Sequence, residues 1–184
     1  MGISTPKLNR SFTNFILKQQ VFFVATAAPN GRVNMSPKGL DSLRVISPTK
    51  ILWLSVTGSG NETAAHLLKN DRMTLMFCAF EGDHLTLRVY GSARVIHPRD
   101  AQWDALYGHF PDFAGARNIF ELDIELVTTS CGSGVPEMSV VRTRAETDLV
   151  PWYDDMGPEG VTDFWQKKNV TSIDGFPTRI FDGD

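Results

Sequence analysis

The feature that most constrains the fold of this chain is a succession of short apolar runs, rich in β-branched and aromatic residues, with turn signals between them. Such runs favour β-strands. The turn Pro29-Asn30-Gly31 contains Asn-Gly, the strongest short-range hairpin signal. Six or seven mostly antiparallel strands joined by short turns predict a mainly β protein built as a barrel, and not a doubly wound sheet or a helical bundle. The expected strands are residues 21–28, 32–35, 43–46, 50–56, 73–80, 85–97 and 119–129.

Short helices are expected at the connections and after the last strand. Asn61 is suited to cap a helix that carries Glu62 in its first turn and Lys69 in its last. Pro98 is suited to the first turn of a second helix. Gly91 lies inside a long strand, where it predicts a bulge or a bend. The expected helices are residues 9–20, 61–69, 98–110, 143–152 and 158–168.

The whole chain, residues 1–184, is expected to form a single domain. Its 184 residues, 42% hydrophobic and 21% charged, are typical of a globular protein with a core of its own. The barrel is expected to span about residues 10–130. Residues 131–184 form a partly helical C-terminal tail with too few apolar positions to fold alone, so we expect this tail to pack on the barrel or on a partner subunit.

Composition argues against several classes of protein. The net charge of −3 argues against non-specific nucleic-acid binding, which requires a dense basic surface. No apolar run approaches the roughly 20 residues of a membrane span, and residues 1–20 do not resemble a secretory signal. Cys78 and Cys131 do not make a disulfide framework, so a reducing, cytoplasmic setting with both thiols free is expected.

The candidate site lies where an apolar strand runs into a small polar turn, Thr57 to Asn61, which leads into a helix. Backbone N–H groups at a helix N-terminus attract anions. Lys38, which closes an earlier strand together with Ser36, adds a full positive charge. Because the strand before the turn is able to line a flat ring, the pattern predicts a site for a phosphorylated cofactor.

A series of short stretches between about residues 10 and 130 follows the order found in a known family. They are Phe23-Val24-Ala25-Thr26 with Asn30-Gly31, Val33-Asn34-Met35-Ser36-Pro37-Lys38-Gly39, Trp53-Leu54-Ser55, Ser59-Gly60-Asn61-Glu62-Thr63, Leu68-Lys69-Asn70-Asp71 and Tyr90-Gly91-Ser92-Ala93. Together they resemble the pyridoxamine 5′-phosphate oxidase-like flavoproteins. The downstream stretches Ser130-Cys131-Gly132, Gly134-Val135-Pro136, Lys168-Asn169 and Ser172-Ile173-Asp174-Gly175 resemble one bacterial and fungal subgroup of that family.

The resemblance implies a six- to seven-stranded antiparallel split β-barrel of the FMN-binding type with a C-terminal helical tail, forming a homodimer with FMN at its interface. By position, Ser36 and Lys38 lie near the flavin or its phosphate. The strand 53–57 offers backbone groups to the ring edge, and the turn 59–63 holds the phosphate. The cofactor-binding residues that we carry over are Ser36, Lys38, Trp53, Ser55, Thr57, Ser59, Gly60, Asn61, Glu62, Thr63, Cys131, Lys168 and Asn169, the last two expected to complete the site of the partner subunit.

Two classes of function stay open at this point. The true pyridoxamine phosphate oxidases end in an arginine-rich motif, whereas residues 174–184 contain one arginine and three acidic residues, so vitamin B6 synthesis is not expected. The first hypothesis is an FMN-dependent oxidoreductase acting on an unidentified small molecule, with no catalytic residue assigned. The second is a non-catalytic module that binds FMN or haem for storage, sensing or delivery. A third, weaker hypothesis is a structural dimer whose site has decayed.

Each candidate residue also has an ordinary structural interpretation. Lys38 is typical of a solvated turn, Ser59-Gly60-Asn61 of a helix cap, and Trp53 of a core. Cys131 is either a reactive thiol or a small packed residue. No serine has His and acid partners by sequence signature, which disfavours hydrolase chemistry. No metal site is predicted, because the spacing of the histidines supports no cluster; they are His66, His84, His97 and His109.

Overall fold

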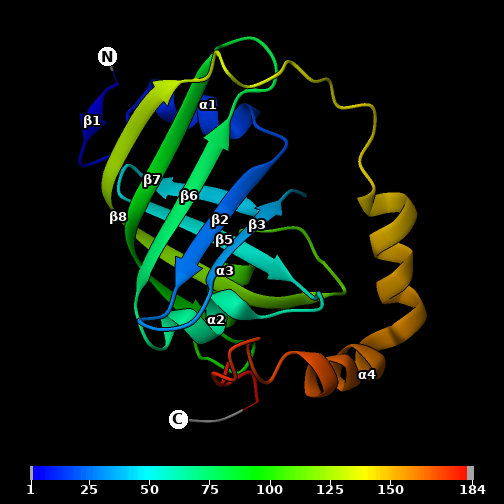
Figure 1. Cartoon of the computed structure of the whole chain (residues 1–184). Helices are drawn as coiled ribbons and strands as arrows, with labels where there is room; N and C mark the ends of the chain where they lie inside the picture. Colours follow the sequence, from blue (N-terminus) through cyan, green and yellow to red (C-terminus); the bar gives the residue numbers. More distant parts are fainter. Residues whose placement is uncertain (1, 182–184) are drawn as a thin grey trace.

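The structure is a computed structural model that describes residues 2–181. Within these residues, one antiparallel sheet of eight strands has the order β3-β2-β6-β7-β8-β5-β4, and β1 pairs with β8. The sheet curls into a barrel that stays open, because the edge strands β3 and β4 do not pair with each other (Figure 1). The predicted mainly β split barrel is therefore confirmed. The strands are β1 Ser4–Thr5, β2 Phe22–Ala27, β3 Val33–Lys38, β4 Leu43–Ser47, β5 Lys50–Val56, β6 Arg72–Cys78, β7 Leu85–Ile96 and β8 Ala116–Cys131.

Side-chain alternation and two glycines explain the strand pattern. In β2, Phe22, Val24 and Thr26 are buried while the residues between them are half-buried. Gly31 has φ +95° in the β2–β3 turn, a conformation open to glycine at little cost. Gly91 lies at the register shift between β7 and β8, where a side chain would collide with a backbone carbonyl, so the predicted bulge is confirmed.

Two strand boundaries differ from the prediction by three residues, and one strand was not predicted. The strand expected at residues 32–35 continues to Lys38 as β3, because β3 is an edge strand and tolerates Pro37, which has no N–H group. The last strand begins at Ala116 and not at residue 119, because Asn118 and Ala116 still pair with Ser55 and Val56 of β5, with a register shift at Arg117 between them. Strand β1 was not predicted, since two polar residues carry no periodic signal.

The apolar interior divides into two clusters. The larger fills the barrel and includes Val24, Leu75, Leu87, Val89 and Leu122, all with 0% exposure. The smaller lies on the other face of β5 and β8, beneath α3. Its members are Leu52, Leu54, Ile96, Trp103, Phe110 and Ile119. Strands β5 and β8 are thus packed on both faces, which makes them rigid supports for residues at their ends.

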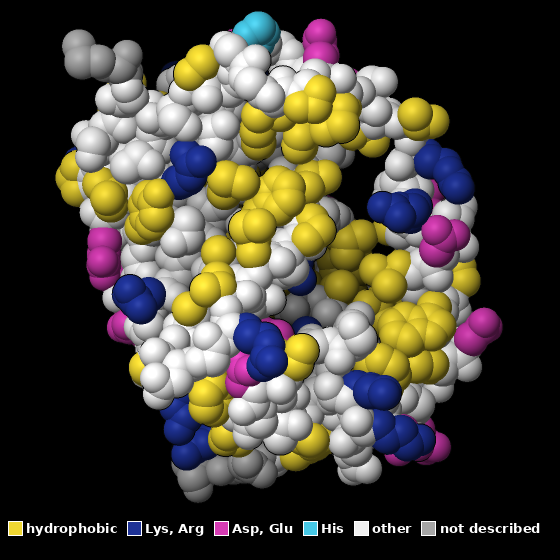
Figure 2. Space-filling view, viewed as in Figure 1, with side chains coloured by type: hydrophobic (Ala, Val, Ile, Leu, Met, Phe, Trp, Pro, Cys, Tyr) yellow, Lys and Arg dark blue, Asp and Glu magenta, His cyan; other side chains and the backbone are white. Residues whose placement is uncertain are grey.

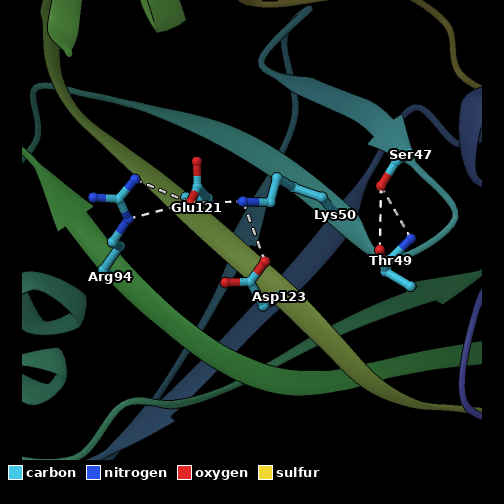
Figure 3. A network of polar contacts seen from close by, with 6 residues as sticks. All are labelled: Ser47, Thr49, Lys50, Arg94, Glu121 and Asp123. Atoms are coloured by element: carbon cyan, nitrogen blue, oxygen red, sulfur yellow. Dashed lines mark hydrogen bonds and ion pairs between the residues drawn. The ribbon is translucent and has the colours of Figure 1, made fainter.

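An ion-pair network joins β5, β7 and β8 on the face of the sheet that carries the smaller apolar cluster (Figure 3). The Glu121 carboxylate, with a side chain 8% exposed, accepts hydrogen bonds from Lys50 Nζ at 2.9 Å and Arg94 Nη2 at 3.1 Å. Burial raises the pKa of Glu121, but hydrogen bonds from these two cations outweigh that effect and hold it below its usual value. Lys50 also contacts Asp123 at 3.2 Å. The network fixes the register of β8 against both neighbours.

Helices lie at the ends of the barrel and beside it. Asn9 caps α1 (Arg10–Lys18) by accepting a hydrogen bond from the N–H of Phe12 at 2.8 Å. Phe12, Phe15 and Ile16 are buried as their spacing predicts, whereas Leu17 is 61% exposed. The chain also forms α2 (Glu62–Leu67), α3 (Trp103–Tyr107), a π-helix, η1 (Ala145–Leu149), and α4 (Val150–Lys168), which bends at Gly157.

One predicted helix start is wrong, and one predicted capping hydrogen bond is not formed. Residues 98–102 form turns, and α3 begins only at Trp103. The reason is a local turn in which the N–H of His97 donates to the Asp100 carboxylate at 2.7 Å, so Pro98 does not open a helix. Asn61 precedes α2, but its side chain makes no capping hydrogen bond. Its Nδ2 points instead toward the carbonyl of Asn169, 3.5 Å away.

The tail leaves the barrel and returns to it (Figure 1). Residues 136–144, here called the arm, are exposed and lead from the end of β8 to η1 and α4. Beyond α4, the carboxylate of Asp174 binds the side chain and the N–H of Arg32, and the N–H of Ile173 donates to Glu62 at 3.1 Å. The tail therefore packs on the barrel of its own chain. Among the described residues, no helix is long and apolar enough to cross a membrane.

Candidate functional site

A cavity of about 300 Å³ opens at the split of the barrel, between β3, β5, the start of β8 and the turn before α2. Figure 2 shows the surface hollowed between the sheet and α4, with basic side chains inside the hollow and apolar ones around it. Most of the predicted cofactor residues line this cavity, as do five that were not predicted. The predicted ones are Ser36, Lys38, Trp53, Ser55, Ser59, Gly60, Asn61, Glu62 and Thr63; the others are Asn34, Val56, Gly58, Arg117 and Phe120.

Strand β3 supplies one wall by alternation. Asn34, Ser36 and Lys38 face the cavity, whereas Val33 and Met35 face outward and are 74% and 66% exposed. This pattern follows from the period of two along any strand. The interpretation of Lys38 as a solvated turn lysine is wrong, because Lys38 belongs to the paired part of β3, opposite Phe22.

Aromatic rings form the back of the cavity. Trp53 stacks on Phe120, with ring centroids 4.7 Å apart and planes at 20°, and meets Phe22 edge-on at 6.4 Å. Trp53 is 2% exposed, so it is a core residue whose edge borders the cavity. Lys38 Nζ lies 5.3 Å from the centre of the Trp53 ring. The arrangement gives a flat, rigid surface with a cation beside it.

Lys38 is a cation in an unfavourable environment. Burial and, to a smaller extent, the positive charge of Arg117 together lower its pKa from 10.5 to about 8. Within residues 2–181, no carboxylate forms an ion pair with Lys38; the pairs that do occur involve Arg32, Arg44, Lys50 and Arg94. The cavity therefore holds a positive charge that no acidic residue of the described chain neutralises.

Arg117 is the charged residue among the five that sequence reasoning missed. It is 4% exposed, and its Nη1 donates to Asn169 Oδ1 at 2.7 Å and to the carbonyl of Gly60 at 2.9 Å. Its Nη2 lies 3.3 Å from Ser55 Oγ, and its Nε is buried without a partner. Burial lowers the pKa of Arg117 to about 10. The sequence feature that could have revealed it is the position of an arginine at the beginning of an apolar strand, because a charged side chain is unusual where a strand enters the core.

The turn before α2 differs from the predicted phosphate cradle. The helix has six residues and opens on Glu62, so its N-terminus contributes little positive potential. Thr57 does not line the cavity, because its side chain donates to the carbonyl of Gly115 at 2.9 Å and accepts from Trp165 Nε1 at 2.7 Å. The positive character of the site thus comes from Lys38 and Arg117.

The remaining predicted residues lie behind or away from the cavity. Asn169 is fully buried and ends α4, where its Nδ2 donates to the carbonyl of Gly58 at 2.9 Å. It therefore supports the site of its own chain, although we expected it to reach the partner's. Lys168 is exposed, and Cys131 is exposed beside Ser133 at the opposite end of β8 from Arg117. Their roles stay predictions.

A buried polar layer lies under the cavity. His66 Nδ1 lies 3.1 Å from Thr26 Oγ1, and Asn34 Nδ2 donates to Thr63 Oγ1 at 3.3 Å. These contacts connect β2, β3 and α2 and hold the Asn34 side chain in the wall. Among residues 2–181, no group of three or more His, Cys, Asp or Glu side chains is arranged to hold a metal ion. The cavity combines a flat aromatic back, hydroxyl and amide groups, and two cations, which suits a planar ligand that carries an anion.

Comparison with known proteins agrees with this geometry. Residues 8–131 match the family model described as pyridoxamine 5′-phosphate oxidase. A relative from Aspergillus flavus, the pyridoxamine 5′-phosphate oxidase family protein ustO, is 32% identical over 193 residues, which cover 96% of this chain and 78% of the relative.

Solved structures share the fold. One is a protein from Lactobacillus delbrueckii described as a pyridoxamine 5′-phosphate oxidase, with a TM-score of 0.54 and 24% identity over 67% of this chain and 94% of that one. Another is HupZ of Group A Streptococcus, with a TM-score of 0.51 and 19% identity over 65% of this chain and 91% of that one. With the family model matched across the barrel and a relative aligned over nearly the whole length, this chain belongs to the pyridoxamine 5′-phosphate oxidase family.

Proposed function

We propose that this protein binds FMN in the cavity at the split of the barrel and is a flavin-dependent oxidoreductase acting on a small molecule. The observation that carries the proposal is the pair of unneutralised cations, Lys38 and Arg117, beside the flat Trp53–Phe120 surface. A bound flavin would supply two-electron chemistry through its ring. The protein's part is to hold the ring and the phosphate, and to place positive charge where the reduced ring becomes anionic.

The residues present fit a flavin mononucleotide better than the other ligands considered. No second phosphate motif, such as a glycine-rich Rossmann turn, is found in the sequence, which disfavours a dinucleotide. Haem is disfavoured as well, because none of the residues that line the cavity is a His, Cys, Met or Tyr able to hold iron. The single phosphate group of FMN matches the one pair of cations in the cavity, Lys38 and Arg117.

The first prediction concerns the ligand. Purified protein is expected to be yellow, and mass spectrometry of the released molecule is expected to give FMN and not FAD. A haem Soret band in place of flavin absorbance would overturn the proposal. Oxidation of a reduced nicotinamide cofactor by the loaded protein then separates an enzyme from a non-catalytic binding or sensing module, for which the outcome is bound FMN without turnover.

We also propose that two copies of the chain assemble through the outer face of the β3–β2–β6 sheet. Val33 and Met35 on β3 are largely exposed and pair with Ala27 and Ala25 of β2, so a continuous apolar row faces water. Phe23 extends the row beside Met76 of β6. Apolar rows of this kind mark interaction surfaces.

The second prediction tests this assembly. Light scattering at micromolar concentration is expected to give twice the 20.5 kDa mass of the chain. Met35→Glu is expected to shift the protein to the monomer, because a charge is placed inside the apolar interface. Leu17→Glu is the matched control, since Leu17 is similarly exposed but lies on α1. A monomeric wild type with flavin bound, or a Met35→Glu variant that stays dimeric, would contradict this interface.

A further inference from the structure

We propose that Arg117 is the anchor of a site for a phosphate monoester dianion, that Lys38 provides the second positive charge, and that Asn169 holds Arg117 in position. This inference rests on the proposed function and assigns to β8 the phosphate site that the sequence pattern placed at the turn before α2. It concerns the phosphate of the flavin in the first place. Inorganic phosphate has the same chemistry, and the experiment below distinguishes the two.

The first argument is the burial of the Arg117 charge. A buried cation is costly unless it is paired, and buried arginines are ordinarily matched by a carboxylate or a phosphate. The four acceptors around Arg117 are all neutral: the carbonyls of Gly58 and Gly60, the hydroxyl of Ser55, and the amide oxygen of Asn169. These bonds orient the guanidinium but leave its charge unneutralised.

The second argument is an unused donor. The Nε–H of Arg117 is buried and has no acceptor within the described chain. Buried donors without partners are rare in native proteins and require a reason. Because guanidinium N–H groups are arranged in a planar fork, they match two oxygens of one phosphate group. Arg117 lines the cavity, so its guanidinium is the charged group of β8 that an anion bound there would meet.

The third argument is the position of Lys38. Both cations line the same cavity, and the charge of Arg117 disfavours the charged form of Lys38. Two like charges that share one cavity are relieved by a dianion placed between them. The one acidic residue of the cavity lining, Glu62, forms no ion pair with either cation among the described residues; its carboxylate oxygens lie 3.1 Å from the backbone nitrogen of Ile173 in the tail.

The fourth argument is the support from the tail. Asn169 is fully buried and bridges Arg117 to the Gly58 carbonyl with the two ends of its amide. Its own carbonyl accepts from Thr178 Oγ1 at 2.5 Å, so its backbone is fixed as well. Asn169 does not line the cavity. It is therefore a positioning residue, which acts on the anion through Arg117.

The test is the preference for FMN over riboflavin, which differ only in the phosphate. Flavin-free wild type is titrated with each ligand by fluorescence quenching and is expected to bind FMN roughly 10- to 100-fold more tightly. In Arg117→Gln and in Asn169→Ala the preference is expected to fall below about threefold while riboflavin affinity changes little. Arg94→Gln is the matched control, because Arg94 is a paired, exposed arginine on β7. Equal losses for both ligands would indicate a merely structural role and overturn the proposal.

A second measurement keeps the proposal testable if Arg117→Gln or Asn169→Ala does not fold. The thermal midpoint of flavin-free wild type is expected to rise with inorganic phosphate relative to chloride at equal ionic strength. Arg117→Lys keeps the charge but loses the planar fork of donors. This variant is expected to need at least about tenfold more phosphate for the same rise in thermal midpoint. A wild type that binds FMN and riboflavin equally, without a response to phosphate, refutes the anion site and leaves the flavin proposal standing. A wild type that responds to phosphate through Arg117 but binds neither flavin refutes the flavin proposal alone.

Discussion

A chain that ends at residue 149 is expected to be purified without flavin. The deletion removes α4 and the segment after it, and with them every tail contact on the turn before α2. Tyr153 donates to the carbonyl of Thr57 at 2.6 Å, Trp165 donates to its hydroxyl at 2.7 Å, and Asn169 holds Arg117. Without these bonds the turn and the guanidinium lose their fixed positions, and a site misplaced by about 1 Å binds and reacts far less well.

Single substitutions locate this effect within the tail. Asn169→Ala is expected to weaken FMN binding roughly 10- to 100-fold, because it removes the shortest hydrogen bond of Arg117 and the shorter of the two hydrogen bonds to the Gly58 carbonyl. Lys168→Ala is the matched control, since Lys168 is the preceding residue and is exposed. Flavin absorbance per chain after gel filtration measures both. Equal losses for the two variants would mean that Lys168 takes part directly, as the resemblance implied. A truncated chain that stays yellow would contradict the role of the tail.

Lys38→Met is expected to act in opposite directions on binding and on stability. FMN affinity should fall roughly 10- to 100-fold through loss of a charge-assisted contact, whereas the free energy of unfolding of the flavin-free protein should rise by about 1–2 kcal/mol. The gain arises because folding moves the Lys38 ammonium into a partly desolvated cavity beside Arg117, which lowers its pKa from 10.5 to about 8. Lys69→Met is the control: Lys69 is exposed just beyond α2, outside the cavity.

The pH dependence has a defined sign. Below pH 8 Lys38 is charged in both states, and the full cost of burying the charge is present. Between pH 8 and 10.5 the unfolded chain binds more protons at Lys38 than the folded one, so this residue makes stability rise with pH across that window. Denaturant unfolding of flavin-free protein at pH 7.5 and 9.5 should show the rise in the wild type and not in Lys38→Met. FMN affinity should decline more in the wild type than in Lys38→Met between pH 7.5 and 9.5, because the charged lysine is lost while Arg117, with a pKa of about 10, stays mostly charged. A Lys38→Met variant that is less stable than the wild type at pH 7.5 would contradict this account.

The parts of the fold that sequence predicts best are those governed by short-range patterns. The β2–β3 hairpin follows from Asn30-Gly31, and the buried alternation of β2 follows from its apolar residues. The start of α3 was misplaced because Pro98 is compatible both with a first helical turn and with the Asp100 turn that the chain forms. Nothing local distinguishes the two.

The candidate site was predicted in part, because only some of its residues belong to short-range sequence patterns. Residues such as Ser36 and Lys38 were found because they are close in sequence to a strand end and share a motif. Arg117 was missed because its significance depends on contacts 57 and 59 residues away along the chain, to Gly60 and Gly58. The tail was expected to pack on the barrel or on a partner subunit, because its apolar residues have no local core. In the structure, contacts as distant in sequence as Arg32 with Asp174 place it on the same chain.

The arm that connects the barrel to α4 has a consequence for how two copies share their parts. Within the described residues, its one hydrogen bond to the barrel joins the N–H of Met138 to the carbonyl of Phe80. The bonds that seat α4 and Asn169 depend on the presence of Thr57, Gly58 and Arg117, and not on which polypeptide carries them. In an assembly of two copies, an extended, exposed connection of this kind permits exchange of the helix between identical barrels with every contact retained. The contacts alone therefore do not decide whether a helix binds the barrel of its own chain or that of the other copy. The covalent connection favours its own barrel by raising the local concentration of the helix there.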